Sequence, residues 1–298
     1  MDLSQRNNTL KKMASAVVTA SFALAALSAQ ADFQLVVDAE IGSSTLEPDN
    51  QSSTDTDFLA LSGKFYFDKV SSQNSPIRVA GFLSQESSVS AKYQTTDEDL
   101  EKKQTKTLVS LDYHVKDTPW RVGVGIGNVD QKPIDATIFV LGAGYYINNH
   151  SLLSAEIYTE QDDLYDQSNI ILTYETVVPS GQRTLHIVGS MDSSTKELVD
   201  GMDTDESSIE LSGKATLFLN PQLGVGGQVT QAGKSYGDDH NFDSRSDLTL
   251  GVHASYDFNE MLGASIYLNA GAGTVELKNG NDVDFTTNTW GVEVEGRF

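Results

Sequence analysis

The 298-residue sequence has no cysteine and few basic residues, 20 Lys and Arg against 42 Asp and Glu. Without cysteine the chain can form no disulfide, thiolate metal site or cysteine nucleophile. A net charge of -22 argues against nucleic acid as a partner, because phosphate binding requires a basic surface. Proline is scarce, at 6 residues, while glycine is common, at 24. Because 39% of the residues are hydrophobic, too many for a disordered acidic protein, we expect a large folded protein rich in strands and turns.

The first 31 residues have the organisation of an export signal. A basic region that ends at Lys12 is followed by the apolar run Met13–Leu27, and small residues precede Asp32. The run is short for a transmembrane helix and lacks the polar face of a buried amphipathic helix. We therefore predict a signal peptide at residues 1–31, cleaved ahead of Asp32, and a mature domain at residues 32–298. Cleavage removes three basic and one acidic residue from totals of 20 and 42, which leaves 17 and 41.

From Phe33 onward, apolar residues recur at every second position. This period of two places alternate side chains on opposite faces of a sheet, and no window has a helical period of comparable strength. We predict fourteen strands, with twelve or sixteen as alternatives because some segments are weak. They lie at residues 33–41, 59–67, 77–83, 109–115, 120–126, 139–147, 153–157, 170–174, 185–191, 209–219, 223–229, 248–258, 262–270 and 290–298.

The expected connections alternate in length. Those after odd-numbered strands are long and acidic, as in Gly42–Asp57 and Asp192–Ser207, whereas most others are tight, as in Lys116–Pro119 and Asn148–His150. Transmembrane β-barrels have short periplasmic turns and longer extracellular loops, and a soluble sandwich has no reason to separate its loops in this way. The sequence therefore predicts an all-β, antiparallel transmembrane barrel in the lipid of a cell outer membrane.

Aromatic residues gather near one end of these strands, on the apolar face. Amphipathic rings settle at the headgroup level of a bilayer, so such a belt marks a membrane boundary. Trp290 and Phe139 are the best candidates for the opposite boundary, where aromatics are fewer. The membrane-interface aromatics predicted for the periplasmic boundary are Phe33, Phe67, Tyr113, Trp120, Tyr145, Tyr174, Tyr256, Phe258 and Phe298.

The terminal segment Thr289–Phe298 alternates apolar and polar residues and ends in phenylalanine. It resembles the C-terminal assembly signal of Gram-negative outer-membrane barrels. The resemblance implies that the barrel-assembly machinery is a partner, through the strand that ends in Phe298.

A narrower resemblance covers Asp57–Val89. With its strand end Phe65-Tyr66-Phe67, its proline-containing turn and its Ala-Gly-Phe-Leu strand, this segment is similar to the second and third strands of the putative general bacterial porins of marine gammaproteobacteria. Size and layout agree over the whole mature chain. The resemblance implies a pore-forming outer-membrane protein and leaves its solute open. One departure is Arg78-Val79-Ala80-Gly81, where the family's pattern has an acidic residue between alanines.

Charged residues cluster on the strand phase opposite the apolar stripe. Charges that face lipid near the midplane cost several kcal/mol, so this clustering indicates a hydrated lumen, whether open or plugged. Net negative walls predict a modest cation preference. The predicted pore-lining residues are Asp38, Glu40, Lys64, Arg78, Asp112, His114, Arg121, Glu156, Glu175, His186, Glu210, Lys214, His253, Asp257, Glu293 and Glu295.

The bases among these residues favour the early strands. Lys64, Arg78 and Arg121 fall on the second, third and fifth predicted strands, whereas most acids fall on later strands. One hypothesis is a transverse field across the lumen that orients dipolar solutes. The alternative is solvated wall charge without such order.

No metal, cofactor or catalytic site is predicted. Gly237–Asp243 and Asp200–Glu206 are rich in oxygen ligands suited to Ca²⁺, but neither has EF-hand spacing and exposed acidic loops are common. The sequence contains no Gly-x-Ser-x-Gly and no His-Glu-x-x-His motif, which argues against the corresponding hydrolases.

Two classes of function therefore compete. The first is a porin-like channel for passive diffusion of small hydrophilic solutes. The second is a non-conducting barrel whose acidic extracellular loops act as an adhesin, receptor or structural element. Solute and gating stay open, as does the choice between monomer and trimer. Liposome swelling and single-channel conductance would discriminate between the two classes.

Overall fold

The computed structural model describes residues 32–49, 52–72, 75–98, 102–131, 134–162, 165–198, 206–237 and 242–298. The predicted signal peptide lies outside these residues, as do residues 200–205 and 238–241 of the two acidic segments considered for Ca²⁺. Among the described residues no helix is long and apolar enough to cross a membrane.

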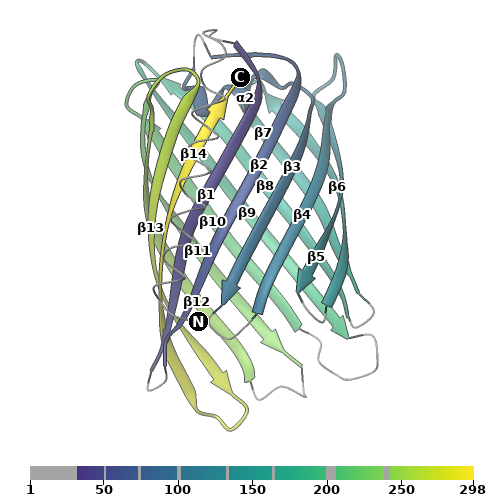
Figure 1. Ribbon diagram of the computed structural model, residues 1–298, viewed down its shortest axis with the longest axis vertical. Coiled ribbons are helices and arrows are strands. Elements are labelled where there is room, and N and C mark those ends of the chain that lie inside the picture. The colour runs from purple at the N-terminus through teal and green to yellow at the C-terminus, as the bar shows by residue number, and fades with distance from the viewer. Residues whose placement is uncertain are drawn as a thin grey trace.

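Fourteen antiparallel strands close into one barrel, in which β14 pairs with β1 (Figure 1). The predicted fold class and strand number are therefore confirmed. The elements are β1 (Asp32–Pro48), β2 (Thr54–Ser71), α2 (Ile77–Ser84), β3 (Ser88–Glu98), β4 (Lys102–His114), β5 (Trp120–Gln131), β6 (Ile134–Asn148), β7 (Ser151–Gln161), β8 (Tyr165–Ser180), β9 (Arg183–Leu198), β10 (Glu206–Phe218), β11 (Leu223–Tyr236), β12 (Phe242–Asp257), β13 (Leu262–Leu277) and β14 (Asp282–Arg297).

The strands are longer than their apolar stripes. They contain 11 to 18 residues, whereas about 9–11 residues suffice to cross a bilayer. Most of the predicted link Gly42–Asp57 is paired strand, because β1 runs to Pro48 and β2 starts at Thr54. The prediction of long loops after odd-numbered strands is therefore wrong. Beyond the bilayer both faces of a hairpin are wet, so the hydrophobic period disappears while the backbone ladder continues.

The predicted third strand, residues 77–83, is wrong, because these residues form the helix α2. Pro76 occupies the N-cap, and its fixed φ suits the start of a helix. Gln85 ends the helix in the left-handed conformation, with a φ of 56°. The true third strand is Ser88–Glu98, inside the predicted link Ser84–Thr105.

Helix α2 lies across the interior of the barrel and packs against two separate walls. Figure 1 shows it at the end that carries the C-terminus, called the α2 end below. One apolar cluster joins the helix to β1 and β2, through Phe33, Tyr66, Val70, Ile77 and Ala80. A second cluster joins it to β8 and β10, through Val79, Val177 and Phe218, with Phe82 and Leu83 beside them.

One predicted interface aromatic faces the interior of the barrel instead of the lipid. Phe33 is only 5% exposed and packs edge-on against Tyr66 inside the barrel. The pairing of β1 with β2 shifts register between Phe33 and Leu35, so the ring turns from the lipid phase to the interior. The other strand aromatics of that prediction are 41–57% exposed, namely Phe67, Tyr113, Trp120, Tyr145, Tyr174, Tyr256, Phe258 and Trp290.

The close approach of α2 to β2 depends on Gly81. A Cβ atom at this position would overlap the hydroxyl of Tyr66. We expect Gly81→Val to weaken the docking of α2 by about 1–3 kcal/mol, the usual cost of overpacking. Hydrogen exchange of the α2 amides should then accelerate about tenfold or more.

Gly63→Val is the matched control, because nothing lies within 4 Å of a Cβ at Gly63. It should leave α2 exchange unchanged. Equal exchange in both variants would show that α2 is not held by this contact.

Candidate functional site in the barrel lumen

The strand register gathers inward-facing carboxylates in two rows across neighbouring strands. Asp38 on β1 lies opposite Glu295 on β14, and Glu40 lies opposite Glu293. The first row continues through Gly263 on β13 to Asp257 on β12. Like charges directly opposite one another destabilise a sheet, so this array requires compensation by cations or by hydrogen-bond donors.

Two arginines supply positive charge to the array. Arg297, only 1% exposed, bonds the Oδ1 of the fully buried Asp257 through Nη2 at 2.9 Å and also contacts Glu295. Arg78 reaches the array from α2. Its Nε lies 3.6 Å from Asp257 Oδ1, and its Nη1 lies 3.5 Å from Glu293 Oε2 and 3.9 Å from Glu295 Oε2. The prediction that Arg78 lies on a strand with the other bases is therefore wrong. Arg78 extends from a helix to the acidic wall.

Hydroxyl groups stabilise the same carboxylates. Ser62 donates to Asp38 at 2.9 Å and Ser265 donates to Glu293 at 2.6 Å. On the inner face of the barrel, Tyr267 of β13 donates a hydrogen bond of 2.8 Å past β14 to Glu40 of β1. Carboxylates that accept such bonds tolerate partial burial better than bare ones.

Inward-facing polar side chains on β4 and β5, and on β8 and β9, lie in pairs. Arg121 Nη2 and Nε lie 2.7 and 3.1 Å from Asp112 Oδ1, and His186 Nε2 lies 2.9 Å from Glu175 Oε1. The pair of Arg121 and Asp112 balances charge locally and reduces the contrast between walls that the transverse-field hypothesis requires.

Two lumen lysines differ from these paired groups. Among the described residues, neither Lys64 nor Lys214 has a carboxylate within ion-pair distance, and Lys64 Nζ lies 5.4 Å from the ring centre of Tyr66. Each lysine lines a separate cavity, so its charge is available to a solute. Glu86 lines the same cavity as Lys64. Burial raises the pKa of the Glu86 carboxyl, and the nearby charge of Asp68 raises it further.

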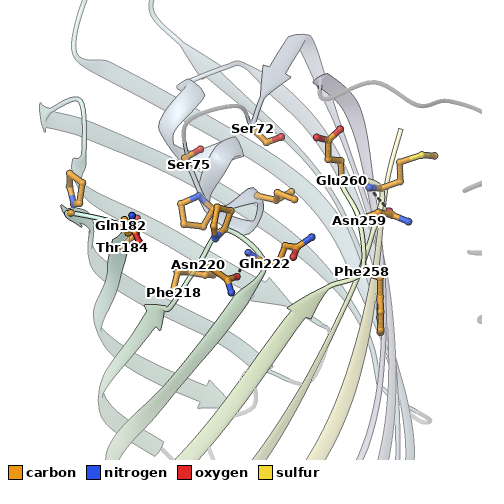
Figure 2. Close-up of a pocket in the computed structure, with 16 residues that line it drawn as sticks. Ser72, Ser75, Gln182, Thr184, Phe218, Asn220, Gln222, Phe258, Asn259 and Glu260 are labelled. Atoms are coloured by element: carbon orange, nitrogen blue, oxygen red, sulfur yellow. Dashed lines mark hydrogen bonds between the residues drawn. The ribbon is translucent and has the colours of Figure 1, made fainter.

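Three cavities meet at α2. The Lys64 cavity, of about 450 Å³, follows the wall from β1 to β5 and also reaches β6, β8 and β14. The Lys214 cavity, of about 540 Å³, follows the wall from β9 through β14 to β1. Both are lined by Arg78 and Glu295. A mouth cavity of about 1190 Å³ opens at the α2 end, between the start of α2 and the turns after β8, β10 and β12 (Figure 2).

The mouth cavity borders both lumen cavities. Ile77 lines the mouth cavity and the Lys64 cavity, and Phe218 lines the mouth cavity and the Lys214 cavity. Helix α2 therefore stands between the mouth and the rest of the lumen, with a polar space on each side.

The structure distributes the predicted pore-lining residues as follows. Those on the Lys64 cavity are Asp38, Lys64, Arg78, Asp112, His114, Arg121, Glu175 and Glu295. Those on the Lys214 cavity are Glu40, Arg78, His186, Lys214, His253, Glu293 and Glu295. The remaining three, which line neither cavity, are Glu156, Glu210 and Asp257. Sequence reasoning missed Tyr267 and Gly263, because only the cross-strand register brings them to the acidic rows.

Comparisons with known proteins agree with this architecture. A family model described as "Putative general bacterial porin" matches residues 10–295. Omp33 of Acinetobacter baumannii is 17% identical, with a TM-score of 0.53 over 90% of this chain and 99% of that chain. The CymD monoaromatic hydrocarbon channel is 10% identical, with a TM-score of 0.51 over 89% of each chain. At these identities the two likenesses show the fold alone. No curated protein matches the chain.

The buried pair of Arg297 and Asp257 yields a stability prediction. We expect Arg297→Met to lower the free energy of unfolding by about 3–5 kcal/mol, because it leaves a buried carboxylate without its closest partner. Urea unfolding of the folded barrel in lipid vesicles measures the change.

Arg245→Met is the control. Arg245 pairs with Asp247 at 3.1 Å but is about a third exposed, and exposed pairs contribute up to about 1 kcal/mol. Similar midpoints for the two variants would contradict a special role of the buried pair.

Proposed function

The chain belongs to the family of putative general bacterial porins, whose model spans residues 10–295, and on this premise we propose that it is a channel for passive diffusion of small hydrophilic solutes. The protein resides in the outer membrane as a transmembrane β-barrel. The family and the barrel also favour a channel over an enzyme.

One observation supports the channel most directly. Polar and charged side chains line a cavity on each side of α2, and both cavities border the mouth cavity. The outward phase of the same strands is apolar and exposed, as at Leu141, Val252 and Ile266. A lumen that is polar inside an apolar shell suits solutes that cannot cross lipid.

A second candidate is a barrel that does not conduct. The position of α2 favours it, because the helix packs on both walls of the lumen. The adhesin form of this candidate loses its main support, since the segments expected to be long acidic loops are mostly paired strand.

We further propose that the C-terminal strand is the element that the barrel-assembly machinery recognises. The carbonyl of Phe298 accepts backbone bonds from Gln34 at 2.7 Å and from Leu35 at 2.9 Å. The last residue thus completes the seam between β14 and β1, which supports a role in closing the barrel.

Conductance separates the two candidates. We expect the folded protein to conduct ions in planar bilayers and to admit small sugars in liposome swelling. Gly81→Val should raise the conductance, because α2 then occupies the lumen less firmly, whereas Gly63→Val should leave it unchanged. The channel proposal would be refuted by a folded barrel that gives neither conductance nor liposome swelling, with or without the Gly81 substitution.

We propose a modest preference for cations, supported by the excess of acidic groups in the Lys214 cavity. Glu40→Gln should weaken this preference in reversal-potential measurements under a KCl gradient, since field focusing makes lumen charges effective. The amide retains the acceptor for Tyr267. Asp117→Asn, in the exposed turn after β4, should have no such effect because solvent screens its charge. Anion selectivity of the unchanged protein would refute the proposal.

A further inference from the structure

Asp38, Asp257, Glu293 and Glu295 form an acid cage around the end of Arg78. One carboxylate oxygen from each of Asp38, Glu293 and Glu295 lies within 4.8 Å of the others. Asp257 lies in the same row as Glu295, and its fully buried side chain has an Oδ2 atom without a hydrogen-bond partner. Four carboxylates packed in this way repel one another strongly in a partly dry site, so the cage attracts a cation.

The cation now in the cage is held loosely. Charge-assisted N–H···O bonds are about 2.7–2.9 Å long, yet Arg78 approaches its three carboxylates only to 3.5–3.9 Å. Its Nε and Nη2 atoms are buried and have no hydrogen-bond partner. Arg297 is different, because it bonds Asp257 at 2.9 Å from within strand β14. Arg297 is thus part of the wall, and Arg78 is an occupant of the cage.

The missing side chain of Gly263 makes room for the side chains of the cage. Gly263 faces the cage, and a Cβ atom there would overlap Asp257 Oδ1 and lie 3.1 Å from Arg78 Nη2. The Lys214 cavity adjoins the cage through Glu293 and Glu295 and holds about 540 Å³, which is within the range of small-molecule sites. A solute in this cavity can therefore reach the carboxylates.

We propose that the acid cage binds guanidinium-bearing solutes and that Arg78 is its internal competitor. A planar guanidinium fork matches paired carboxylates better than a compact ammonium group does. A divalent metal ion is disfavoured, because the positive charges of two arginines already lie against the carboxylates. The inference rests on the proposed channel, since solutes reach the cage through the lumen, and it identifies cationic solutes as the class that the channel retains.

Removal of the internal competitor tests the proposal. Calorimetric titration of the folded, full-length barrel in detergent micelles measures the dissociation constant of butylguanidinium. Arg78→Met should tighten binding about tenfold or more, because the cage is then vacant. Glu293→Gln added to Arg78→Met should abolish that gain. Butylammonium should bind more weakly than butylguanidinium, and the neutral isostere butylurea should show no gain.

Arg121→Met is the matched control. It also removes a lumen arginine, but one that Asp112 holds at 2.7 Å outside the cage, so butylguanidinium affinity should stay at the value of the unchanged protein. Equal affinities in the Arg78 and Arg121 variants would overturn the proposal, as would Mg²⁺ binding to the vacated cage in preference to butylguanidinium.

A second variant covers the case in which Arg78→Met does not fold, as judged by heat-modifiable migration in gels. Glu293→Gln in the otherwise unchanged protein should weaken butylguanidinium binding, and unchanged binding would overturn the proposal. Conductance is measured separately. A conducting barrel without the affinity gain overturns only the cage, whereas an affinity gain without conductance overturns only the channel.

Discussion

Closure of the sheet is the constraint on which the rest of the structure depends. Inside a bilayer every backbone N–H and C=O must find a partner within the protein, so β1 must pair with β14. That pairing runs from Val36 opposite Arg297 to Pro48 opposite Phe285. Because side chains alternate with a period of two, a slip of one residue would turn the whole inward set towards lipid. The seam therefore determines which charges share the lumen.

The seam also creates an electrostatic problem that the interior solves. It sets Asp38 against Glu295 and Glu40 against Glu293, which is unfavourable without nearby positive charge. Arg297 supplies one cation from the same strand, and α2 supplies the other by carrying Arg78 to the wall. The apolar clusters that hold α2 thus position a charge, and the position of that charge explains why a helix lies inside a hydrated barrel.

The barrel could be predicted from the sequence because one physical signal, the alternation of apolar residues, repeats along the chain. The same signal failed at residues 77–83, where Ala80 and Phe82 make the second phase apolar as well. Pro76, next to this run, was the available sign of a helix start. The true third strand does alternate, with Val89, Ala91 and Tyr93 on the outer phase, but it lies among polar residues.

Strand ends and the acid cage were beyond sequence reasoning for a different reason. Outside the bilayer, pairing continues through backbone bonds that leave no hydrophobic period, so β1 and β2 extend past their apolar stripes. The inward phase of the cage residues followed from alternation, but their proximity did not. It depends on the register across four strands and on Gly263, where the lack of a side chain lets Asp257 and Arg78 meet.

The two arginines of the cage differ in what holds their backbones, and this difference links charge to permeation. Arg297 belongs to a strand whose backbone bonds are required in lipid, so its charge cannot leave without opening the barrel. Arg78 belongs to a short helix inside the lumen, where water can satisfy any backbone group that is released. Movement of Arg78 therefore costs only apolar contacts and loose ion pairs. A cation that replaced it in the cage would remove part of what keeps α2 across the lumen.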